Sequence, residues 1–304
     1  MKYFIVDAFT DRPFGGNPAG VVLLEGDTFP EEELMLHIAA ELRYSETAFV
    51  RRHSEREYTV RYFTPAAEVE LCGHATIATF ALLHQMQLAE GECLCHTLAG
   101  DLRIEAGTQT SSPLRGTPPN TGGELSRVLM QMAAPRIVKT ISDIAPVYHA
   151  LGLDGYRPEL PLQVAYAGLA DIMIPVADVD TLNSLQPDME AIATITREYD
   201  AVSFHLFALP TNTLTHLHIN TFTAHVRDFA PLYGVPEESA TGTANAALTH
   251  YLATNKVIPP HGNFTFLQGE AMHRPSVVAT RLDEDGTLYV GGTAYVLASG
   301  ELSI

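Results

Sequence analysis

The segment 75–87 constrains the fold of this chain most, because it is a helix candidate that is apolar on nearly every side. Seven apolar residues are spread around its circumference: Ile77, Ala78, Phe80, Ala81, Leu82, Leu83 and Met86. A helix of that kind is normally buried. Short strand-like segments precede and follow it, so the sequence predicts a sheet curled around a central helix.

The same plan recurs about half a chain later. Phe63-Thr64-Pro65 precedes Cys72-Gly73-His74, and Phe229-Ala230-Pro231 precedes Thr241-Gly242-Thr243. The F-x-P tripeptides are 166 residues apart (229 − 63), and the glycines are 169 apart (242 − 73). A second helix of small residues is expected over 243–253. Each half is therefore predicted to carry a strand, an F-x-P loop, a glycine turn and a central helix. The glycines would let the backbone turn sharply into the helix and would let a ligand approach it closely.

Composition narrows the class of protein. The 304 residues suffice for about two domains. Lys plus Arg is 18 and Asp plus Glu is 36, so the net charge of −18 argues against nucleic acid and anionic membranes as partners. Three cysteines cannot all pair, the apolar run Tyr3–Val6 is too short for a signal-peptide core, and no segment approaches the length of a membrane helix. A cytoplasmic protein is the expectation.

The remaining elements are expected from local patterns. A helix that follows Pro30 should place Leu34, Ile38 and Leu42 on one face. The segment 107–124, rich in Gly, Pro, Ser and Thr, is expected to be an exposed loop. The boundary between the halves is expected within 136–144. Strands are expected at 3–9, 21–24, 47–50, 58–63, 127–132, 164–166, 171–176, 201–209, 216–222 and 287–296.

The two glycine turns are the strongest functional signal. Each places free backbone N–H groups at a helix start, where the positive end of the helix dipole lies. Two such ends facing one cleft could hold a carboxylate or a developing oxyanion. The alternative is that both turns are ordinary helix entries.

Glu46 and His74 are the candidate proton-transfer residues. Glu46 enters a strand among apolar neighbours, where burial raises the pKa of a carboxyl group and makes it usable near neutrality; a surface glutamate is the alternative. His74 begins the buried helix, where the dipole favours a neutral imidazole that hydrogen-bonds a substrate. A capping or packing role is the alternative for His74.

The roles of three further residues, Cys72, Glu237 and Glu238, stay open. Cys72 could act as a thiolate base at a helix N-terminus, although the equivalent position holds Thr241 and a buried free cysteine is the simpler interpretation. Glu237 and Glu238 either bind a substrate or form a solvated acidic loop.

Metal and nucleotide chemistry find little support in the motifs. Cys93-Leu94-Cys95-His96 and His216-Leu217-His218 resemble metal-ligand pairs, but neither has a well-spaced second pair. The glycine-rich nucleotide motifs and the nucleophile-elbow motif are absent from the sequence.

Motifs from both halves, taken in order, resemble the phenazine-biosynthesis isomerase-like (PhzF-like) family, which has the diaminopimelate-epimerase-like fold. The matching segments are Asp7-Ala8-Phe9-Thr10, Phe14-Gly15-Gly16-Asn17-Pro18-Ala19-Gly20, Ser45-Glu46-Thr47-Ala48-Phe49, Arg61-Tyr62-Phe63-Thr64-Pro65, Cys72-Gly73-His74-Ala75-Thr76 and Ala240-Thr241-Gly242-Thr243-Ala244-Asn245. The combination is specific, whereas each piece alone is weak.

The resemblance implies an α+β fold with two similar domains, each an open, mostly antiparallel β-barrel wrapped around a central helix. The domains would comprise 1–138, with a last strand at about 294–304, and 139–293. The resemblance also implies that the protein forms a homodimer, needs no cofactor or metal, and acts in phenazine biosynthesis. Its founding activity is isomerisation of trans-2,3-dihydro-3-hydroxyanthranilate by moving a proton between ring carbons.

Carried over residue by residue, the resemblance makes Glu46 the general acid and base. His74 and Glu238 would hold the substrate and tune the Glu46 carboxylate. Substrate-binding groups would be Asn17, Gly73, Gly242 and Thr243. Glu238-Ser239 stands where the family commonly has Asp-Pro, so the substrate stays open. Two alternatives remain: an amino-acid racemase or epimerase that uses Cys72, and a non-catalytic ligand-binding or interaction protein on the same fold.

Overall fold

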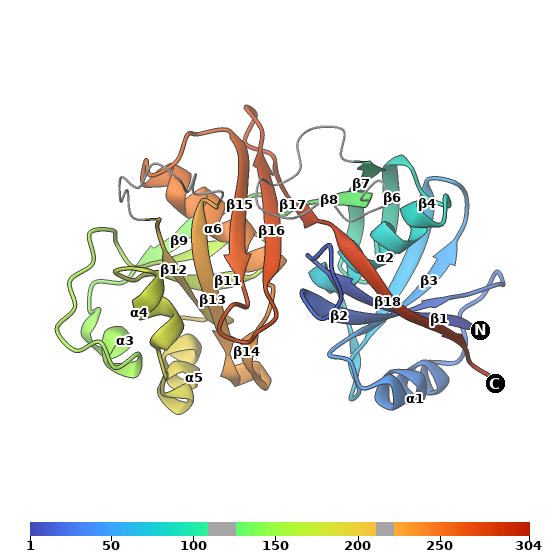
Figure 1. The fold of residues 1–304 in the computed structure, drawn as a ribbon, viewed down its shortest axis with the longest axis horizontal. Helices are drawn as coiled ribbons and strands as arrows, with labels where there is room; N and C mark the ends of the chain where they lie inside the picture. Colours follow the sequence, from blue (N-terminus) through green and yellow to red (C-terminus); the bar gives the residue numbers. More distant parts are fainter. Residues whose placement is uncertain (109–125, 211–221) are drawn as a thin grey trace. The chain divides into compact units, whose positions relative to one another are not determined.

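Helix α2 (Gly73–Gln85) is buried on every side in the computed structural model of this chain, as its apolar circumference predicts. Ten consecutive residues, 74–83, are buried. The structure describes residues 1–108, 126–210 and 222–304. The chain folds into two compact units: unit 1 is Met1–Gln131 with Gly291–Ile304, and unit 2 is Met132–Val290. Figure 1 shows both units with most of their elements labelled.

Unit 1 consists of a strand layer around α2 and a second helix, α1 (Glu32–Leu42). Arg43 ends α1 in the left-handed conformation, with φ of 61°. Its strands are β1 (Lys2–Ala8), β2 (Asn17–Leu23), β3 (Thr47–Arg52), β4 (Glu57–Phe63), β5 (Glu68–Val69), β6 (Gly91–Thr97), β7 (Gly100–Thr108), β8 (Ser126–Gln131) and β18 (Ala294–Glu301).

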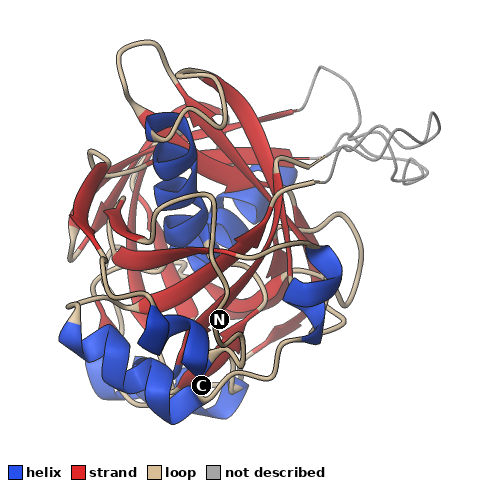
Figure 2. Ribbon diagram, turned by 90° about the vertical axis from the view of Figure 1, so that its left-hand side faces the viewer, coloured by secondary structure: helices blue, strands red, loops and turns tan. Residues whose placement is uncertain are grey.

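Unit 2 has its own central helix, α6 (Gly242–Thr254), and three peripheral helices, α3 (Ala145–Ala150), α4 (Val179–Ser184) and α5 (Met189–Glu198). A short 3-10 helix, Pro231–Tyr233, precedes β14. The strands are β9 (Arg136–Thr140), β10 (Gln163–Tyr166), β11 (Ala170–Pro175), β12 (Ser203–Ala208), β13 (Ala224–Ala230), β14 (Val235–Glu238), β15 (Gly262–Gln268) and β16 (Ser276–Leu282). Strand β17 (Leu288–Gly292) begins in unit 2, and its last two residues belong to unit 1. Figure 2 shows strands curving around a helix.

The strand pairing is the same in the two units, which confirms the internal repeat. In unit 1, β2 pairs with β3 in parallel, β3 with β4 antiparallel, and β4 with β6 in parallel. In unit 2, β11, β12, β13 and β15 pair in the same order and directions. Each central helix lies in the crossover that precedes the second parallel partner, so the repeat places α2 and α6 at equivalent positions.

The two faces of β12 pack against different parts of unit 2. Phe204 and Leu206 point into a core cluster with residues of α3, α4 and α5. The alternate residues face the other way, and the ring of Phe207 contacts the ring of Tyr251 on α6, with 5.5 Å between centroids. The sheet of unit 2 is therefore covered on both faces, and Ser203 and His205 share the face of Phe207.

The expected fold class is confirmed, and two details of the sequence analysis are corrected. Neither Gly73 nor Gly242 has a positive φ, so the backbone conformation of the entry turns does not require glycine. A Cβ on Gly73 would meet one atom, Met130 Cε, at an ordinary 3.8 Å. Leu34 is 36% exposed, and Met35 takes the buried place on α1.

Two expected segments fall mostly or wholly outside the described residues: the loop at 107–124 and the strand at 216–222. The other expected strands coincide with observed ones to within a few residues, although the segment 287–296 is divided between β17 and β18. In the described part of the chain, no helix has both the length and the apolar character that a membrane crossing requires.

Candidate functional site

The N-terminus of α2 brings three reactive side chains of unit 1 together. Cys72 is the N-cap residue, with φ of −138° and ψ of 115°, and its side chain makes no capping hydrogen bond. His74 lies in the first turn, and Glu46 directly precedes β3. The backbone of Glu46 is fixed by β2, because its carbonyl accepts a hydrogen bond from Gly20 N at 3.1 Å. Strand pairing and helix entry therefore position the cluster.

Glu46 and His74 form the closest acid–imidazole pair of this cluster. Glu46 Oε2 lies 3.3 Å from His74 Nε2, and the side chains are 21% and 6% exposed. The Oε2 atom is buried and has no hydrogen-bond partner of good geometry. Ser45 Oγ also lies 3.4 Å from Nε2. One carboxylate oxygen is thus held in a largely dry place without being used by the protein.

Burial lowers the pKa of His74, and the charge of Glu46 opposes this by raising it. Burial is the larger cause, so His74 is neutral at neutral pH. A neutral imidazole can donate one hydrogen bond and accept another. On its other side, Cys72 Sγ lies 3.4 Å from Nδ1. The cluster therefore combines a carboxylate, a neutral imidazole and a thiol.

Asn17 is the first residue of β2 and is buried. β2 and β3 are parallel, with Gly20 opposite Thr47. Asn17 and Glu46 therefore lie at the same end of neighbouring strands. Gly73 is the first helical residue of α2, between Cys72 and His74.

The predicted residues of unit 2 surround the N-terminus of α6. Glu238 ends β14, and its Oε2 accepts a hydrogen bond of 2.6 Å from the hydroxyl of Thr241, the N-cap residue. Gly242 is buried at the first helical position, and Thr243, which follows it, is half-buried. Glu46 and His74 thus lie together in unit 1, and Glu238, Gly242 and Thr243 lie together in unit 2.

Gln268 organises the unit 2 cluster and was missed by the sequence analysis. Its Oε1 accepts hydrogen bonds from Thr241 N at 3.0 Å and Asn245 Nδ2 at 2.8 Å. Its Nε2 donates to the carbonyl of Glu238 at 2.8 Å and to Thr241 Oγ1 at 3.0 Å. Gln268 follows Phe264 and Phe266 on one buried face of β15, so a polar residue in an inward-facing position was the available signal.

The glycine after Gln268 is required by its backbone. Gly269 has φ of +79°, and a Cβ there would lie 2.3 Å from Arg274 O and 2.7 Å from Ser239 O. The close approach to Ser239 holds the end of β15 against the segment that leads into α6. No side chain larger than hydrogen fits this position.

Glu237 takes neither of the roles that the sequence left open. Its carboxylate accepts two hydrogen bonds from Arg227, at 2.8 and 2.9 Å. Arg227 is 5% exposed and also donates to the carbonyls of Leu182 and Leu185. Glu237 is therefore a structural partner of a buried guanidinium rather than a solvated or substrate-binding acid.

The side chains of the cysteine–histidine motif on β6 do not point toward one common site. Cys93 and Cys95 are buried, whereas His96 points to the opposite face and contacts Glu57 and Asp101. His216 and His218 lie outside the described residues. Within residues 1–108, 126–210 and 222–304, the one group of three potential metal ligands is Glu46, Cys72 and His74, with one ligand atom from each within 4.8 Å of the others.

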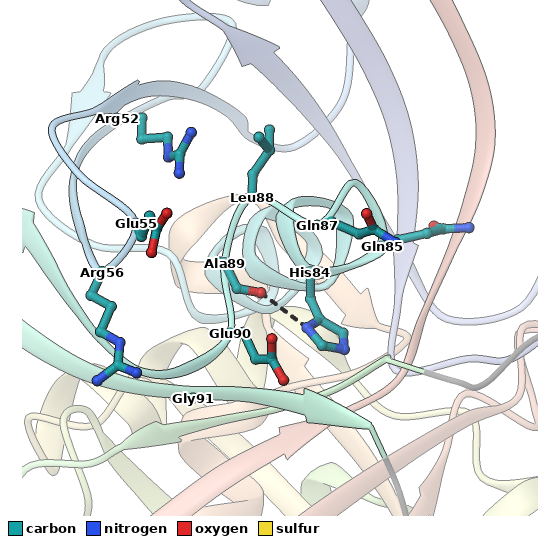
Figure 3. A pocket seen from close by; sticks show the side chains of 10 residues that line it. All are labelled: Arg52, Glu55, Arg56, His84, Gln85, Gln87, Leu88, Ala89, Glu90 and Gly91. Carbon is teal, nitrogen blue, oxygen red and sulfur yellow. Dashed lines mark hydrogen bonds between the residues drawn. The ribbon is translucent and has the colours of Figure 1, made fainter.

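A separate pocket of about 880 Å³ opens at the other end of α2. His84, ten residues after His74 and thus about 15 Å farther along the helix, lines it and contacts the carbonyl of Ala89 at 2.9 Å. Two arginines, Arg52 and Arg56, and two glutamates, Glu55 and Glu90, also line it, as Figure 3 shows. None of the predicted site residues lines this pocket, so it is not part of the candidate site.

The sequence matches a protein-family model over nearly its whole length. The model is described as phenazine biosynthesis-like protein (PhzC-PhzF) and matches residues 6–300. A protein of Deinococcus radiodurans named as an uncharacterized isomerase is 37% identical, over 98% of this chain and 94% of the relative. The similarity therefore extends over both units.

Solved structures show the same architecture. The crystal structure of a Bacillus anthracis phenazine biosynthesis protein of the PhzF family matches with a TM-score of 0.82 and 27% identity, over 100% of this chain and 99% of that one. A probable proline racemase from Agrobacterium radiobacter, solved with bound carbonate, matches with a TM-score of 0.63 and 12% identity, over 100% and 93%. The second likeness concerns the fold alone.

Proposed function

Because the chain belongs to the phenazine biosynthesis-like protein family, we propose that it is an isomerase that moves a proton on a small carboxylic acid. Glu46 is the general acid and base in this proposal. The observation that carries it is the buried Glu46 Oε2, which lies 3.3 Å from His74 Nε2 and has no hydrogen-bond partner. A carboxylate oxygen that the protein does not use is available to a substrate proton.

The chemistry requires one group that removes a proton from carbon and returns it to another carbon. The Glu46 carboxylate would take the proton from a carbon α or vinylogous to the substrate carboxylate. The resulting carboxylic acid would then deliver that proton to the second carbon, which leaves Glu46 ionised again. Neutral His74 would donate a hydrogen bond to the substrate, where charge develops in the transition state.

Glu238 and the helix N-termini would hold the rest of the substrate. In unit 2 the Glu238 carboxylate already accepts the Thr241 hydroxyl at 2.6 Å, which fixes its position despite the extra methylene relative to the aspartate that the family commonly has. The backbone N–H groups at Gly73 and Gly242, with Thr243 and Asn17, are proposed to bind the carboxylate and line the site. No lysine or arginine is needed for this recognition.

We propose trans-2,3-dihydro-3-hydroxyanthranilate as the first substrate to test, with phenazine biosynthesis as the pathway it would serve. The resemblance in the glutamate and histidine motifs supports this choice. It also supports a homodimer, which light scattering after size-exclusion chromatography would detect.

Deuterium incorporation tests the role of Glu46. In heavy water the wild-type protein should exchange the transferred proton of the substrate, and Glu46→Gln should slow this exchange by about 10²–10⁴-fold. Glu57→Gln is the matched control, because Glu57 Oε1 also lies beside a histidine, 3.1 Å from His96 Nε2, but in an exposed pair. Equal exchange rates in Glu46→Gln and wild type would refute the proposal.

The same exchange assay distinguishes the proposed isomerase from a racemase that uses Cys72. A racemase that uses this thiol predicts severe loss of exchange in Cys72→Ser and a second base facing it. The counterpart of Cys72 is Thr241, whose hydroxyl is already engaged with Glu238. We therefore expect Cys72→Ser to retain most of the exchange activity.

A further inference from the structure

The thiol of Cys72, the imidazole of His74 and the carboxylate of Glu46 combine the three side-chain types that bind zinc in proteins. Cys72 and His74 are buried, and Glu46 is mostly buried. The three potential ligand atoms lie within 4.8 Å of one another. Glu46 is distant in the sequence from Cys72 and His74, so no local motif marks the three residues as one site.

The distances are close to those of a tetrahedral site. Bond lengths of about 2.0–2.1 Å to nitrogen and oxygen and about 2.3 Å to sulfur separate the ligands of zinc by about 3.3–3.5 Å. His74 Nε2 is 3.3 Å from Glu46 Oε2 and 3.9 Å from Cys72 Sγ. All three ligand atoms lie within 4.8 Å of one another, so side-chain shifts of about 1 Å would bring them into a coordination sphere with a fourth position open.

The charges also favour a divalent cation. An ionised Glu46, a Cys72 thiolate and a neutral His74 sum to −2, which one Zn²⁺ cancels in a largely buried place. The net charge of −18 for the whole chain attracts cations further.

We propose that Cys72, His74 and Glu46 form a binding site for Zn²⁺ or a similar transition-metal ion. On binding, the Cys72 thiol loses its proton to solvent and its sulfur bonds to the metal, with no change in oxidation state. Metal occupancy commits Glu46 to coordination. If Glu46 is the proton carrier under the function proposed above, the metal blocks isomerisation, and this consequence alone rests on that function.

Cobalt spectroscopy of the untagged protein tests the site without reference to activity. One equivalent of Co²⁺ should produce the near-ultraviolet charge-transfer band of a cobalt–thiolate bond, together with the visible bands of a tetrahedral ion, and Zn²⁺ should abolish both. Cys72→Ser should lose the charge-transfer band. Cys93→Ser, which removes another buried thiol of unit 1, should keep it.

Zinc competition against a chromophoric chelator provides the second measurement. Glu46→Gln should weaken zinc binding by at least about tenfold, because an amide oxygen is a poorer ligand than a carboxylate. Its fold should persist, since Glu46 Oε2 has no hydrogen-bond partner to lose. The proposal is overturned by absence of the band in wild type, by identical spectra of Cys72→Ser and Cys93→Ser, or by unchanged zinc affinity of Glu46→Gln. A metal site with normal isotope exchange in Glu46→Gln would instead overturn only the proposed function.

Discussion

Two buried histidine–carboxylate pairs of this chain differ in what surrounds them. In unit 1, His74 Nε2 lies 3.3 Å from a carboxylate oxygen that has no hydrogen-bond partner. In unit 2, His205 Nδ1 contacts Asp228 Oδ1 at 2.8 Å, and the same oxygen contacts Ser203 Oγ at 2.7 Å. The first pair has a partly exposed acid, whereas the second is sealed, with exposures of 0% and 2%.

The sealed cluster contains a second acid, Asp171, and the number of protons available for hydrogen bonds indicates its protonation state. Ser203 Oγ lies 2.9 Å from Asp171 Oδ1 and 2.7 Å from Asp228 Oδ1, but a hydroxyl has one proton. Both contacts are hydrogen bonds if Asp171 is protonated and donates to Ser203, which in turn donates to Asp228. Burial, and then the charge of Asp228, raise the pKa of Asp171 well above its usual value, in agreement with this arrangement. The sealed pair is a structural device, whereas the open pair keeps an acceptor free for chemistry.

The largest expected effect is on the stability of unit 2 after Asp228→Ala. This substitution leaves the Ser203 hydroxyl and His205 Nδ1 buried without their acceptor. Each buried donor that loses its acceptor costs about 1–3 kcal/mol. Urea unfolding, followed by circular dichroism, would measure the loss.

Two controls sharpen the contrast between sealed and open pairs. Asp154→Ala removes the acid of an exposed pair with His149, 2.9 Å apart, and should change stability far less than Asp228→Ala does. Glu46→Gln should also leave stability nearly unchanged, because no hydrogen bond to Oε2 is lost. A stability loss in Glu46→Gln as large as that in Asp228→Ala would remove the distinction.

The next effect is a pH dependence that Asp171→Asn should abolish. Because the pKa of Asp171 is raised in the folded state, the folded chain keeps a proton that the unfolded chain releases, and stability falls as pH rises above about 4. The slope from one such group is at most about 1.4 kcal/mol per pH unit. Asparagine can still donate to Ser203 but has no proton to release.

Unfolding midpoints in urea between about pH 5 and about pH 8 would show this. The wild type should lose stability over that range relative to Asp171→Asn, and the variant should be the more stable protein at the upper end. Parallel curves for the two proteins would mean that Asp171 is ionised in the folded state.

The smallest effect is on the titration of His74. Its pKa should lie below the ordinary value of about 6.5, because burial outweighs the charge of Glu46. Glu46→Gln removes the one opposing influence, so the pKa should fall further. The ring-proton resonance in nuclear magnetic resonance spectra would report both values. A wild-type pKa above about 6.5 would show that burial is not the dominant cause, and a higher pKa in the variant would show that the charge of Glu46 does not raise the pKa of His74.

The repeated architecture was predictable because it depends on patterns that are local in the sequence. The apolar circumference of 75–87 required a buried helix, and the repeated F-x-P and glycine motifs indicated a second copy. The peripheral helices α3, α4 and α5 were missed. Two of them are six residues long, and their burial depends on contacts with distant strands rather than on a local period. The domain boundaries expected from the sequence remain a prediction.

The candidate site was predictable only where family motifs mark it. The motifs indicated Glu46 and His74, but the proximity of Cys72 to both depends on how β3 and α2 pack. Gln268 and the cluster around Asp228 carry no motif, and their roles follow from strand register: Asp171 stands opposite Ser203, and His205 opposite Asp228. The roles of Asn17, Gly73, Gly242, Thr243 and Glu238 in binding a substrate remain predictions.

Strand β18 has a consequence for the order in which the chain can fold during synthesis. It pairs with β1 along the whole of that strand, from Lys2 opposite Glu301 to Ala8 opposite Ala294. The ribosome makes β1 first, but its partner emerges only after all of unit 2. Because chains emerge from the N-terminus and domains fold as units, we expect unit 2 to complete its fold while unit 1 still lacks a strand. The edge of β1 that β18 will cover is exposed throughout that interval, when it is open to chaperones or to pairing with another nascent chain.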